Sequence, residues 1–181
     1  MAANVLIYDY GGNTGSIQRA LRRLGCQVML GRKPEAGATH QILPGQGSAR
    51  MFIGMEIEDS LPTLGICLGM QMLTEGSDEA PHVPGLGWFK GRAVKLPVEP
   101  LPHIGWNTIN GLADFFFCHS YAVLAANWQL SAYNDSTYRV TQHGPVLFVS
   151  TIEKGRHWGI QAHPEKSGDA GMAYLAAFLK C

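Results

Sequence analysis

Short apolar runs alternate with a helical pattern in the first part of the chain. Residues 4–8 (NVLIY) read as a strand that is buried on both faces of a parallel sheet, and residues 28–30 resume an apolar run. Between them lies an amphipathic helix, with apolar positions at the i, i+3, i+4, i+7 spacing. These positions are Ile17, Ala20, Leu21 and Leu24. The strand–helix–strand order predicts a parallel sheet with right-handed crossovers.

Two further apolar segments predict strands that end at glycine-containing turns. Residues 41–43 lead into the loop 44–47 (PGQG), at the end of a strand where open α/β sheets bind ligands. Residues 63–66 form the next run, and a helical apolar pattern begins at Leu68. The segment 48–61 has room for about two or three helical turns at most.

From residue 87 to about residue 161 the pattern changes to short β-type segments. Turn signals such as Asn110-Gly111 separate them. The segments are residues 88–96, 108–109, 115–123, 128–133, 138–142, 146–152 and 158–161. We expect antiparallel hairpins that extend or flank the sheet.

A final helical pattern packs back on this sheet. It is formed by Met172, Leu175, Ala176 and Leu179. The whole pattern predicts an α/β fold: an open, mainly parallel twisted sheet with flanking helices and added antiparallel strands. With no linker, repeat or low-complexity segment, we expect residues 1–181 to form a single domain.

Composition narrows the function classes. The 181 residues are 46% hydrophobic, enough for a sizeable core, and the formal net charge of +0 gives no reason to expect nucleic acid or an anionic membrane as a partner. No apolar run is long enough to span a bilayer and the start lacks signal-peptide features, so we expect a cytoplasmic protein. The four cysteines have no CxxC spacing and no histidine cluster, which favours reduced thiols over disulfides or a metal site.

Cys67 is the first candidate for chemistry. Gly65 and Gly69 flank it, two residues away on either side, at a strand-to-helix junction. This is the pattern of a nucleophile elbow, a strained turn that presents a reactive side chain. The start of the following helix favours the thiolate form. A lone cysteine would more often be a small core residue, but the paired glycines favour the nucleophile.

His163 and Glu165 supply the groups that a thiol nucleophile needs. They follow a strand and precede a helix, so we expect them at the carboxyl edge of the sheet beside Cys67. Pro164 biases His163 toward an extended conformation. An imidazole takes and returns the thiol proton, and a carboxylate orients the ring. The alternative for His163 is a surface or core histidine whose hydrogen bonds are made and which has no catalytic function. The chain has six other histidines that could be the base instead.

Two motifs together carry a family resemblance over nearly the whole chain. The segments GICLGMQ (65–71) and QAHPEKSG (161–168) resemble those of the class I, or triad, glutamine amidotransferases, which have a flavodoxin-like fold. The segments PHIGWN (102–107) and FCHSY (117–121), the opening DYG and the LPGxG loop are similar to those of the glutaminase subunits of imidazole glycerol phosphate synthases.

The resemblance implies glutamine hydrolysis without a cofactor or metal. Cys67 would form a γ-glutamyl thioester, with His163 as base and acid and Glu165 orienting it. Leu68 N–H and a donor at Gln46 or Gly47 would form the oxyanion hole. The resemblance also implies a glutamine pocket made by Gly45, Gln71, Glu79, His119, Ser120 and Tyr121. For Glu79, a solvated acidic turn is an equal alternative.

The resemblance further implies a partner, a separate (β/α)₈ cyclase subunit that would use the ammonia in histidine biosynthesis. Asn13, Trp106 and Lys166 would lie at that interface, although Trp106 could equally be a core residue.

The chain departs from the family pattern at several points. Gln46 stands where a small apolar residue is usual, Ala162 replaces an aromatic residue, the turn 9–13 is one residue shorter and the segment 48–61 is trimmed. Three alternatives stay open: a glutaminase serving another synthase, a cysteine hydrolase on a similar elbow, and a non-catalytic binding module.

Overall fold

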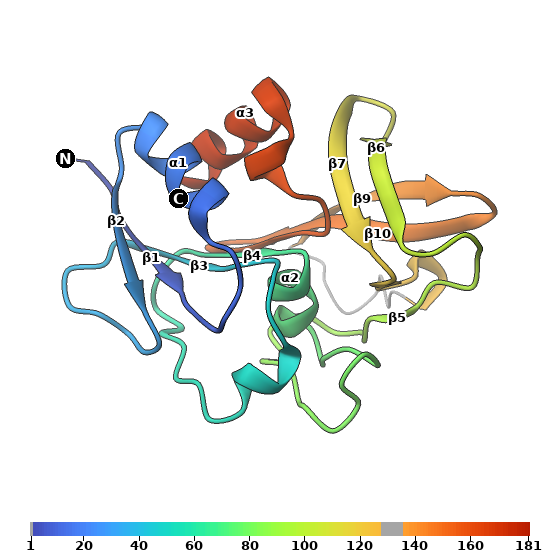
Figure 1. Ribbon diagram of the computed structural model, residues 1–181, viewed down its shortest axis with the longest axis horizontal. Coiled ribbons are helices and arrows are strands. Elements are labelled where there is room, and N and C mark those ends of the chain that lie inside the picture. The colour runs from blue at the N-terminus through green and yellow to red at the C-terminus, as the bar shows by residue number, and fades with distance from the viewer. Residues whose placement is uncertain (1, 128–135) are drawn as a thin grey trace.

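The computed structural model describes residues 2–127 and 136–181, and its centre is a seven-stranded sheet (Figure 1). The strand order is β2-β1-β3-β4-β11-β10-β9. The strands are β1 (Asn4–Tyr8), β2 (Gln27–Gly31), β3 (His40–Leu43), β4 (Thr63–Ile66), β9 (Thr137–His143), β10 (Val146–Lys154) and β11 (His157–Ile160). The mainly parallel α/β sheet with added antiparallel strands is therefore confirmed.

One strand is placed differently from expectation. Residues 158–161 were expected in a hairpin, and β11 does pair antiparallel with β10, but its other edge pairs parallel with β4. Its four residues are flanked on both sides by other strands, so it completes the parallel part of the sheet. Only β10 and β9 extend the sheet in antiparallel fashion. The carboxyl ends of β3, β4 and β11 therefore meet at one edge.

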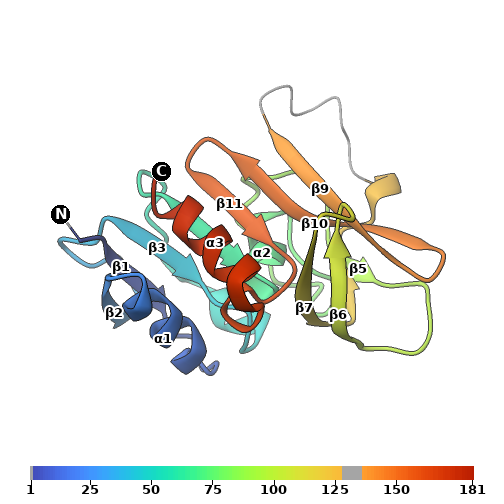
Figure 2. The ribbon, with the colours of Figure 1, turned by 90° about the horizontal axis from the view of Figure 1, so that it is seen from above.

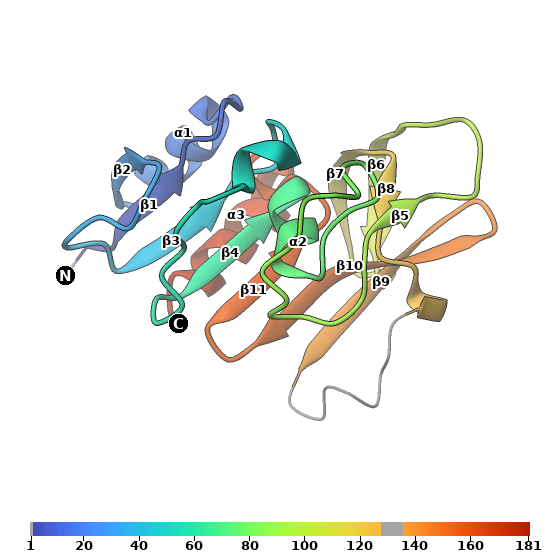
Figure 3. The same cartoon turned by 90° about the horizontal axis from the view of Figure 1, so that it is seen from below.

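Helices cover both faces of the sheet. α1 (Gly15–Arg23) and α3 (Gly168–Phe178) lie on one face (Figure 2), and α2 (Leu68–Leu73) and the 3₁₀ turn η1 (Ala49–Phe52) lie on the other (Figure 3). The apolar run of β1 alternates between them: Val5 and Ile7 join the core under α1 and α3, and Leu6 and Tyr8 join the core under α2. This double burial is the reason why the strand has no polar face.

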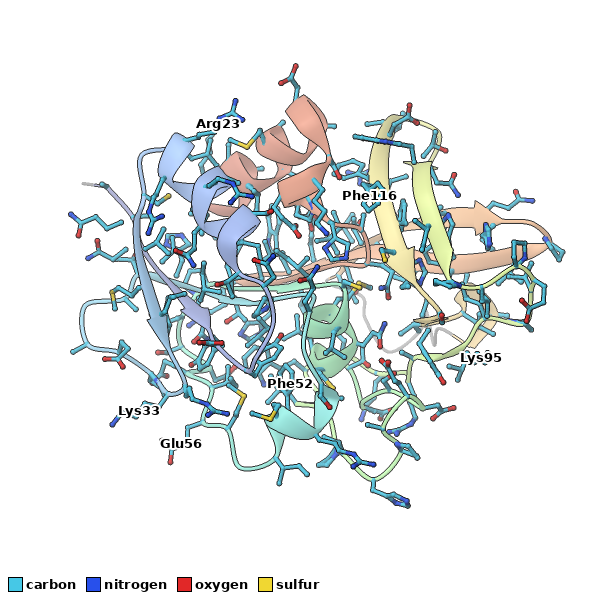
Figure 4. All side chains as sticks on the ribbon, in the orientation of Figure 1. Arg23, Lys33, Phe52, Glu56, Lys95 and Phe116 are labelled. Carbon is cyan, nitrogen blue, oxygen red and sulfur yellow. The ribbon has the colours of Figure 1, made fainter. Side chains whose placement is uncertain are left out.

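The trimmed segment 48–61 contains little regular structure. Its only regular element is the single turn η1, below the two or three helical turns for which it has room. Phe52, labelled in Figure 4, belongs to this turn. Its ring packs on that of Tyr10, with the ring centres 4.5 Å apart. Ala49 and Phe52 from this turn join the core on the α2 face of the sheet, and Met55 and Ile57 pack against it.

Two small antiparallel sheets stand beside the central one. They are formed by β6 (His103–Ile109) with β7 (Ala113–His119), and by β5 (Val94–Lys95) with β8 (Tyr121–Ala122). β6 contacts β9 and β7 contacts α3, so the β6–β7 hairpin lies next to the strand ends of the sheet (Figure 1). Short 3₁₀ turns η2 (Ala125–Asn127) and η4 (Pro164–Lys166) complete the described elements.

Several β-type segments had the wrong extent. The segment 88–96 is a strand only at 94–95, because Gly91 has a φ of 91° and turns the chain before it can pair. The segment 108–109 is the end of a longer strand, and 115–123 divides at Ser120 into β7 and β8. The expected strand 128–133 lies outside the described residues. Within the described part of the chain, no helix is long and apolar enough to cross a membrane.

Candidate active site

Cys67 and His163 meet because their strands are neighbours. Cys67 follows β4 and His163 comes three residues after β11, and the Cys67 N–H donates to the Ile160 carbonyl at 2.7 Å. Gly45, after β3, lies against both: a Cβ built on it would be 2.8 Å from Cys67 Cβ and 2.8 Å from His163 Cε1. Three adjacent parallel strands thus bring the thiol, the imidazole and the glycine loop to one edge.

The backbone at Cys67 is strained, as a nucleophile elbow requires. Its φ of 48° and ψ of −105° are unusual for a residue with a side chain and cost about 1–3 kcal/mol. The glycines allow the tight turn. A Cβ on Gly69 would lie 2.0 Å from the Leu43 carbonyl oxygen, and one on Gly65 would lie 2.7 Å from the Gly69 carbonyl oxygen. The helix after Cys67 therefore packs directly on β3 and β4.

His163 is held at three points. Its backbone N–H donates to the Phe116 carbonyl at 2.8 Å, its carbonyl accepts from the Ser167 hydroxyl at 2.6 Å, and its Nδ1–H donates to Glu165 Oε1 at 2.8 Å. The side chains of His163 and Glu165 are only 3% and 4% exposed. The bond at Nδ1 leaves Nε2 for the thiol.

The protonation of His163 follows from opposing effects. Burial lowers the pKa of His163, but hydrogen bonds and charge interactions with Cys67 and Glu165 outweigh it and raise the pKa to about 10. The ring is therefore a cation at neutral pH, next to the sulfur. A cationic imidazole beside a thiol is the arrangement that favours a nucleophilic thiolate.

A cavity of about 260 Å³ opens on the sulfur. It is lined by nine of the residues that the sequence singled out: Gly45, Gly47, Cys67, Leu68, Gln71, Glu79, His119, Ser120 and Tyr121. Gln71 is 3% exposed, and its Oε1 has no hydrogen-bond partner among the described residues. Buried polar atoms are almost always paired, so this oxygen is an exception among the buried groups next to the cavity.

Gln46 does not line this cavity. Its Oε1 accepts from the Asn13 N–H at 3.3 Å, and a Cβ on Gly12 would lie 2.1 Å from its carbonyl oxygen. The carbonyl of the peptide that joins Gln46 to Gly47 is therefore packed against Gly12. Because this peptide is planar, its N–H, on Gly47, points away from Gly12.

A histidine pair behind the cavity was missed by the sequence reasoning. His119 Nδ1–H donates to the Tyr121 carbonyl at 3.0 Å, so its Nε2 accepts from His103 Nδ1–H at 3.2 Å. His103 Nε2 in turn lies 3.4 Å from the Asn107 amide nitrogen. The Asn110-Gly111 turn could have revealed the pair, because it sets the β6–β7 register in which His103 faces His119.

Burial keeps both rings neutral. Desolvation lowers the pKa of His119 to about 3, with the nearby histidines adding to the effect. Desolvation, followed by the charge of His143, lowers the pKa of His103 to about 4. The pair therefore acts as fixed hydrogen-bond donors and acceptors, and not as proton carriers, at neutral pH.

The three residues expected at a partner interface are exposed around the same edge of the sheet. The Asn13 Oδ1 accepts from the Gly15 N–H at 3.0 Å, in the turn just before α1. Trp106 is 59% exposed, so it is not a core residue, and Lys166 Nζ lies 5.9 Å from the centre of the Phe116 ring. Trp106 pairs across the β6–β7 hairpin with Phe116, which is labelled in Figure 4.

Comparisons with known proteins identify the family of this chain. The sequence profile described as "Glutamine amidotransferase class-I" matches residues 5–181. The chain belongs to the class I glutamine amidotransferase family. Among the described residues of this amidotransferase, no group of three or more histidine, cysteine, aspartate or glutamate side chains is arranged to hold a metal ion.

Its similar relatives narrow the family. The chain is 35% identical to "Imidazole glycerol phosphate synthase subunit HisH" of Corynebacterium glutamicum, over 97% of each chain. It is 37% identical to the protein of the same name from Methanopyrus kandleri, over 97% of this chain and 96% of that one. The chain therefore belongs to the branch of class I glutamine amidotransferases that these synthase subunits form.

Solved structures share the fold of this amidotransferase. One, a "glutamine amidotransferase", has a TM-score of 0.73 and 20% identity, over 97% of each chain. Another, the structure of PurLQS from Thermotoga maritima, has a TM-score of 0.66 and 15% identity, over 99% of each chain. At these identities the likeness concerns the fold alone.

Proposed function

We propose that this chain acts as a single domain in the cytoplasm, where it hydrolyses glutamine to glutamate and ammonia and supplies the ammonia to a (β/α)₈ cyclase subunit of imidazole glycerol phosphate synthase, in histidine biosynthesis. The observation that carries the proposal is the buried set of Cys67, His163 and Glu165, in which the Cys67 thiol lines a cavity large enough for one amino acid and His163 and Glu165 lie behind it. No cofactor enters the reaction.

The reaction divides into two steps. The Cys67 thiolate attacks the side-chain amide carbon of glutamine, and His163 gives its proton to the leaving nitrogen, which departs as ammonia. A γ-glutamyl thioester remains. His163, now neutral, removes a proton from water as the water attacks the thioester carbon. The sulfur leaves as thiolate, glutamate is released, and the imidazolium is restored. Glu165 stabilises the imidazolium before the first step and again when it is restored in the second.

The oxyanion of each tetrahedral intermediate needs two backbone donors. The Leu68 N–H begins α2 directly after the nucleophile, and the Gly47 N–H comes from the loop after β3. Removing one such donor costs about 10²–10³ in rate. The Gln46 side chain accepts a hydrogen bond from the Asn13 N–H at 3.3 Å. The orientation of the loop after β3 therefore depends on the turn after β1.

The cavity offers complementary groups to free glutamine. The Glu79 carboxylate lies at its exposed rim and suits the α-ammonium group of the substrate. Ser120 and Tyr121 line the wall formed by the turn between β7 and β8. Their backbone suits the α-carboxylate.

The exposed face of the β6–β7 hairpin suits the partner. Ile104 is 61% exposed and Trp106 59% exposed, and both side chains are on the face of the hairpin that carries Phe116. Aromatic residues are enriched at the centres of protein interfaces. Lys166 adds a cation beside Phe116, so we infer an acidic group on the cyclase opposite it.

Glutamate release tests the proposal. The chain is assayed alone, with the cyclase subunit, and with the cyclase and its ribonucleotide substrate. We expect strong stimulation in the last mixture, and its complete loss in Cys67→Ala. Cys181→Ala, which removes an exposed thiol at the end of the chain, is the matched control and keeps full activity. Turnover of an ester but not of glutamine, dependent on Cys67, would instead establish a cysteine hydrolase.

A further inference from the structure

Gln161 is a buried polar residue that the mechanism above does not use. It follows β11, two residues before His163, and is 1% exposed. Its backbone N–H donates to the Ser150 carbonyl at 2.8 Å. Its side chain reaches the nucleophile, with Nε2 at 3.5 Å from Cys67 Sγ. Burying a side-chain amide costs free energy unless its N–H and C=O groups make hydrogen bonds, so the partners of this amide matter.

The orientation of this amide is set by a chain of hydrogen bonds that starts at a backbone carbonyl. The Tyr121 carbonyl can only accept, so Gln71 directs its Nε2–H groups toward it, at 2.9 Å. The same nitrogen lies 3.4 Å from Oε1 of Gln161. Gln161 therefore presents its oxygen to Gln71 and its N–H to the sulfur.

The carbonyl at the start of this chain is itself held from the other side. His119 Nδ1–H donates to the Tyr121 carbonyl at 3.0 Å, and His103 supports His119. Because both histidines are neutral at ordinary pH, this support does not change with protonation. The position of the Gln161 N–H group at the sulfur thus depends on hydrogen bonds to residues of β7 and β8, as well as on the backbone of Gln161 itself.

We propose that Gln161 is a catalytic residue that donates a hydrogen bond to the sulfur of Cys67 in its thiolate form. The proposal rests on the proposed function, since it concerns the nucleophile of that reaction. Hydrogen bonds to an ionised acceptor are roughly twice as strong as neutral ones. The donor stabilises the sulfur while it is an anion, before attack and again when it leaves the thioester, and interacts weakly with the uncharged thioester sulfur.

Alkylation of Cys67 by iodoacetamide tests the hydrogen bond without requiring turnover. The rate is measured against pH for the whole chain, with Cys67→Ala subtracting the reaction of the other thiols. In Gln161→Leu, we expect the pH of half-maximal rate to rise by about one unit, a tenfold change in thiolate formation, because the variant loses a hydrogen bond to the ionised sulfur. Glutamine turnover with the cyclase should fall about tenfold.

Two further variants make the test decisive. Gln161→Glu keeps the acceptor for Gln71 and the side-chain shape but places an oxygen at the sulfur, so it should raise the pH of half-maximal rate at least as far. Gln142→Leu replaces an exposed glutamine on β9 and should leave the profile unchanged. Thermal unfolding first establishes that each Gln161 variant is folded. A wild-type alkylation profile in either folded variant would overturn the role of Gln161.

The two proposals fail in different ways. A wild-type profile in either Gln161 variant, with glutamine still hydrolysed by the unmodified chain, overturns only the role of Gln161. A shifted profile, with no glutamine hydrolysis in any mixture, supports the hydrogen bond to Cys67 and overturns the proposed function.

Discussion

The Nδ1 atom of His163 lies 2.8 Å from Oε1 of Glu165, and the second carboxylate oxygen, Oε2, is buried with no hydrogen-bond partner among the described residues. Glutamate and glutamine have the same shape. An amide at position 165 can therefore keep its oxygen on the imidazole and place its NH₂ group where Oε2 lies, which removes the charge but keeps the hydrogen bond.

Glu165→Gln consequently isolates the contribution of charge. The carboxylate is one of the groups that raise the pKa of His163, so we expect that pKa to fall in the variant. Glutamine hydrolysis with the cyclase should fall on the order of 100-fold, since the imidazolium of His163 loses the negative charge that stabilises it. Turnover and an NMR titration of the ring measure the two effects. Glu35→Gln, on an exposed loop, is the control and should change neither.

Gly45→Ala tests how closely the loop after β3 approaches the reacting groups. The new methyl would lie 2.8 Å from both Cys67 Cβ and His163 Cε1, so one of them must move. A displacement of about 1 Å costs about 100-fold in rate. We expect that loss with little change in thermal stability. Gly31→Ala, on the edge strand β2, is the control, because a Cβ there meets only side-chain atoms at 3.2 Å. Full activity in Gly45→Ala would contradict this geometry.

His103 and His119 predict acid sensitivity of the fold. Their pKa values in the folded chain, about 4 and about 3, lie below the ordinary value of 6.5. Between those values and 6.5 the unfolded chain binds protons that the folded chain does not, so the free energy of unfolding falls as the pH is lowered from 6.5. Each histidine contributes a slope of up to about 1.4 kcal/mol per pH unit.

Urea unfolding at pH 7.5, 6 and 5 measures this slope. His103→Leu should be less stable at pH 7.5, because His119 loses a partner, but its stability should depend less on pH. His82→Gln, which replaces an exposed histidine, should retain the wild-type slope. Equal slopes in all three proteins would show that the buried pair does not control acid sensitivity.

Trp106→Ala tests the exposed face of the β6–β7 hairpin. A central aromatic residue of an interface contributes about 2 kcal/mol or more, so we expect affinity for the cyclase to fall about 30-fold or more. Stability of the isolated chain should change little, because the side chain is 59% exposed. Leu147→Ala removes an exposed side chain on β10 and should leave binding intact. Lower stability with unchanged binding would instead assign Trp106 a structural role.

Local patterns in the sequence were sufficient for several elements. The apolar runs at 4–8 and 63–66 are strands with the expected bounds, since a strand buried on both faces has no polar positions to obscure its ends. The glycines around Cys67 indicated its turn, because only residues without a Cβ allow α2 to approach β3 and β4 so closely. The segment 88–96 was wrong because turns at Gly87 and Gly91 outweighed its β propensity.

By itself, the sequence determined the parallel α/β class, the nucleophile turn and the residue types that glutamine chemistry needs, because these depend on short-range spacing and on side-chain identity. The tertiary structure alone decided that β11 lies between β4 and β10, that His103 supports His119, and that Gln161 donates to Cys67. These relationships join residues from 16 to 94 positions apart. They depend on which strands become neighbours and in what register, and no local pattern specifies that.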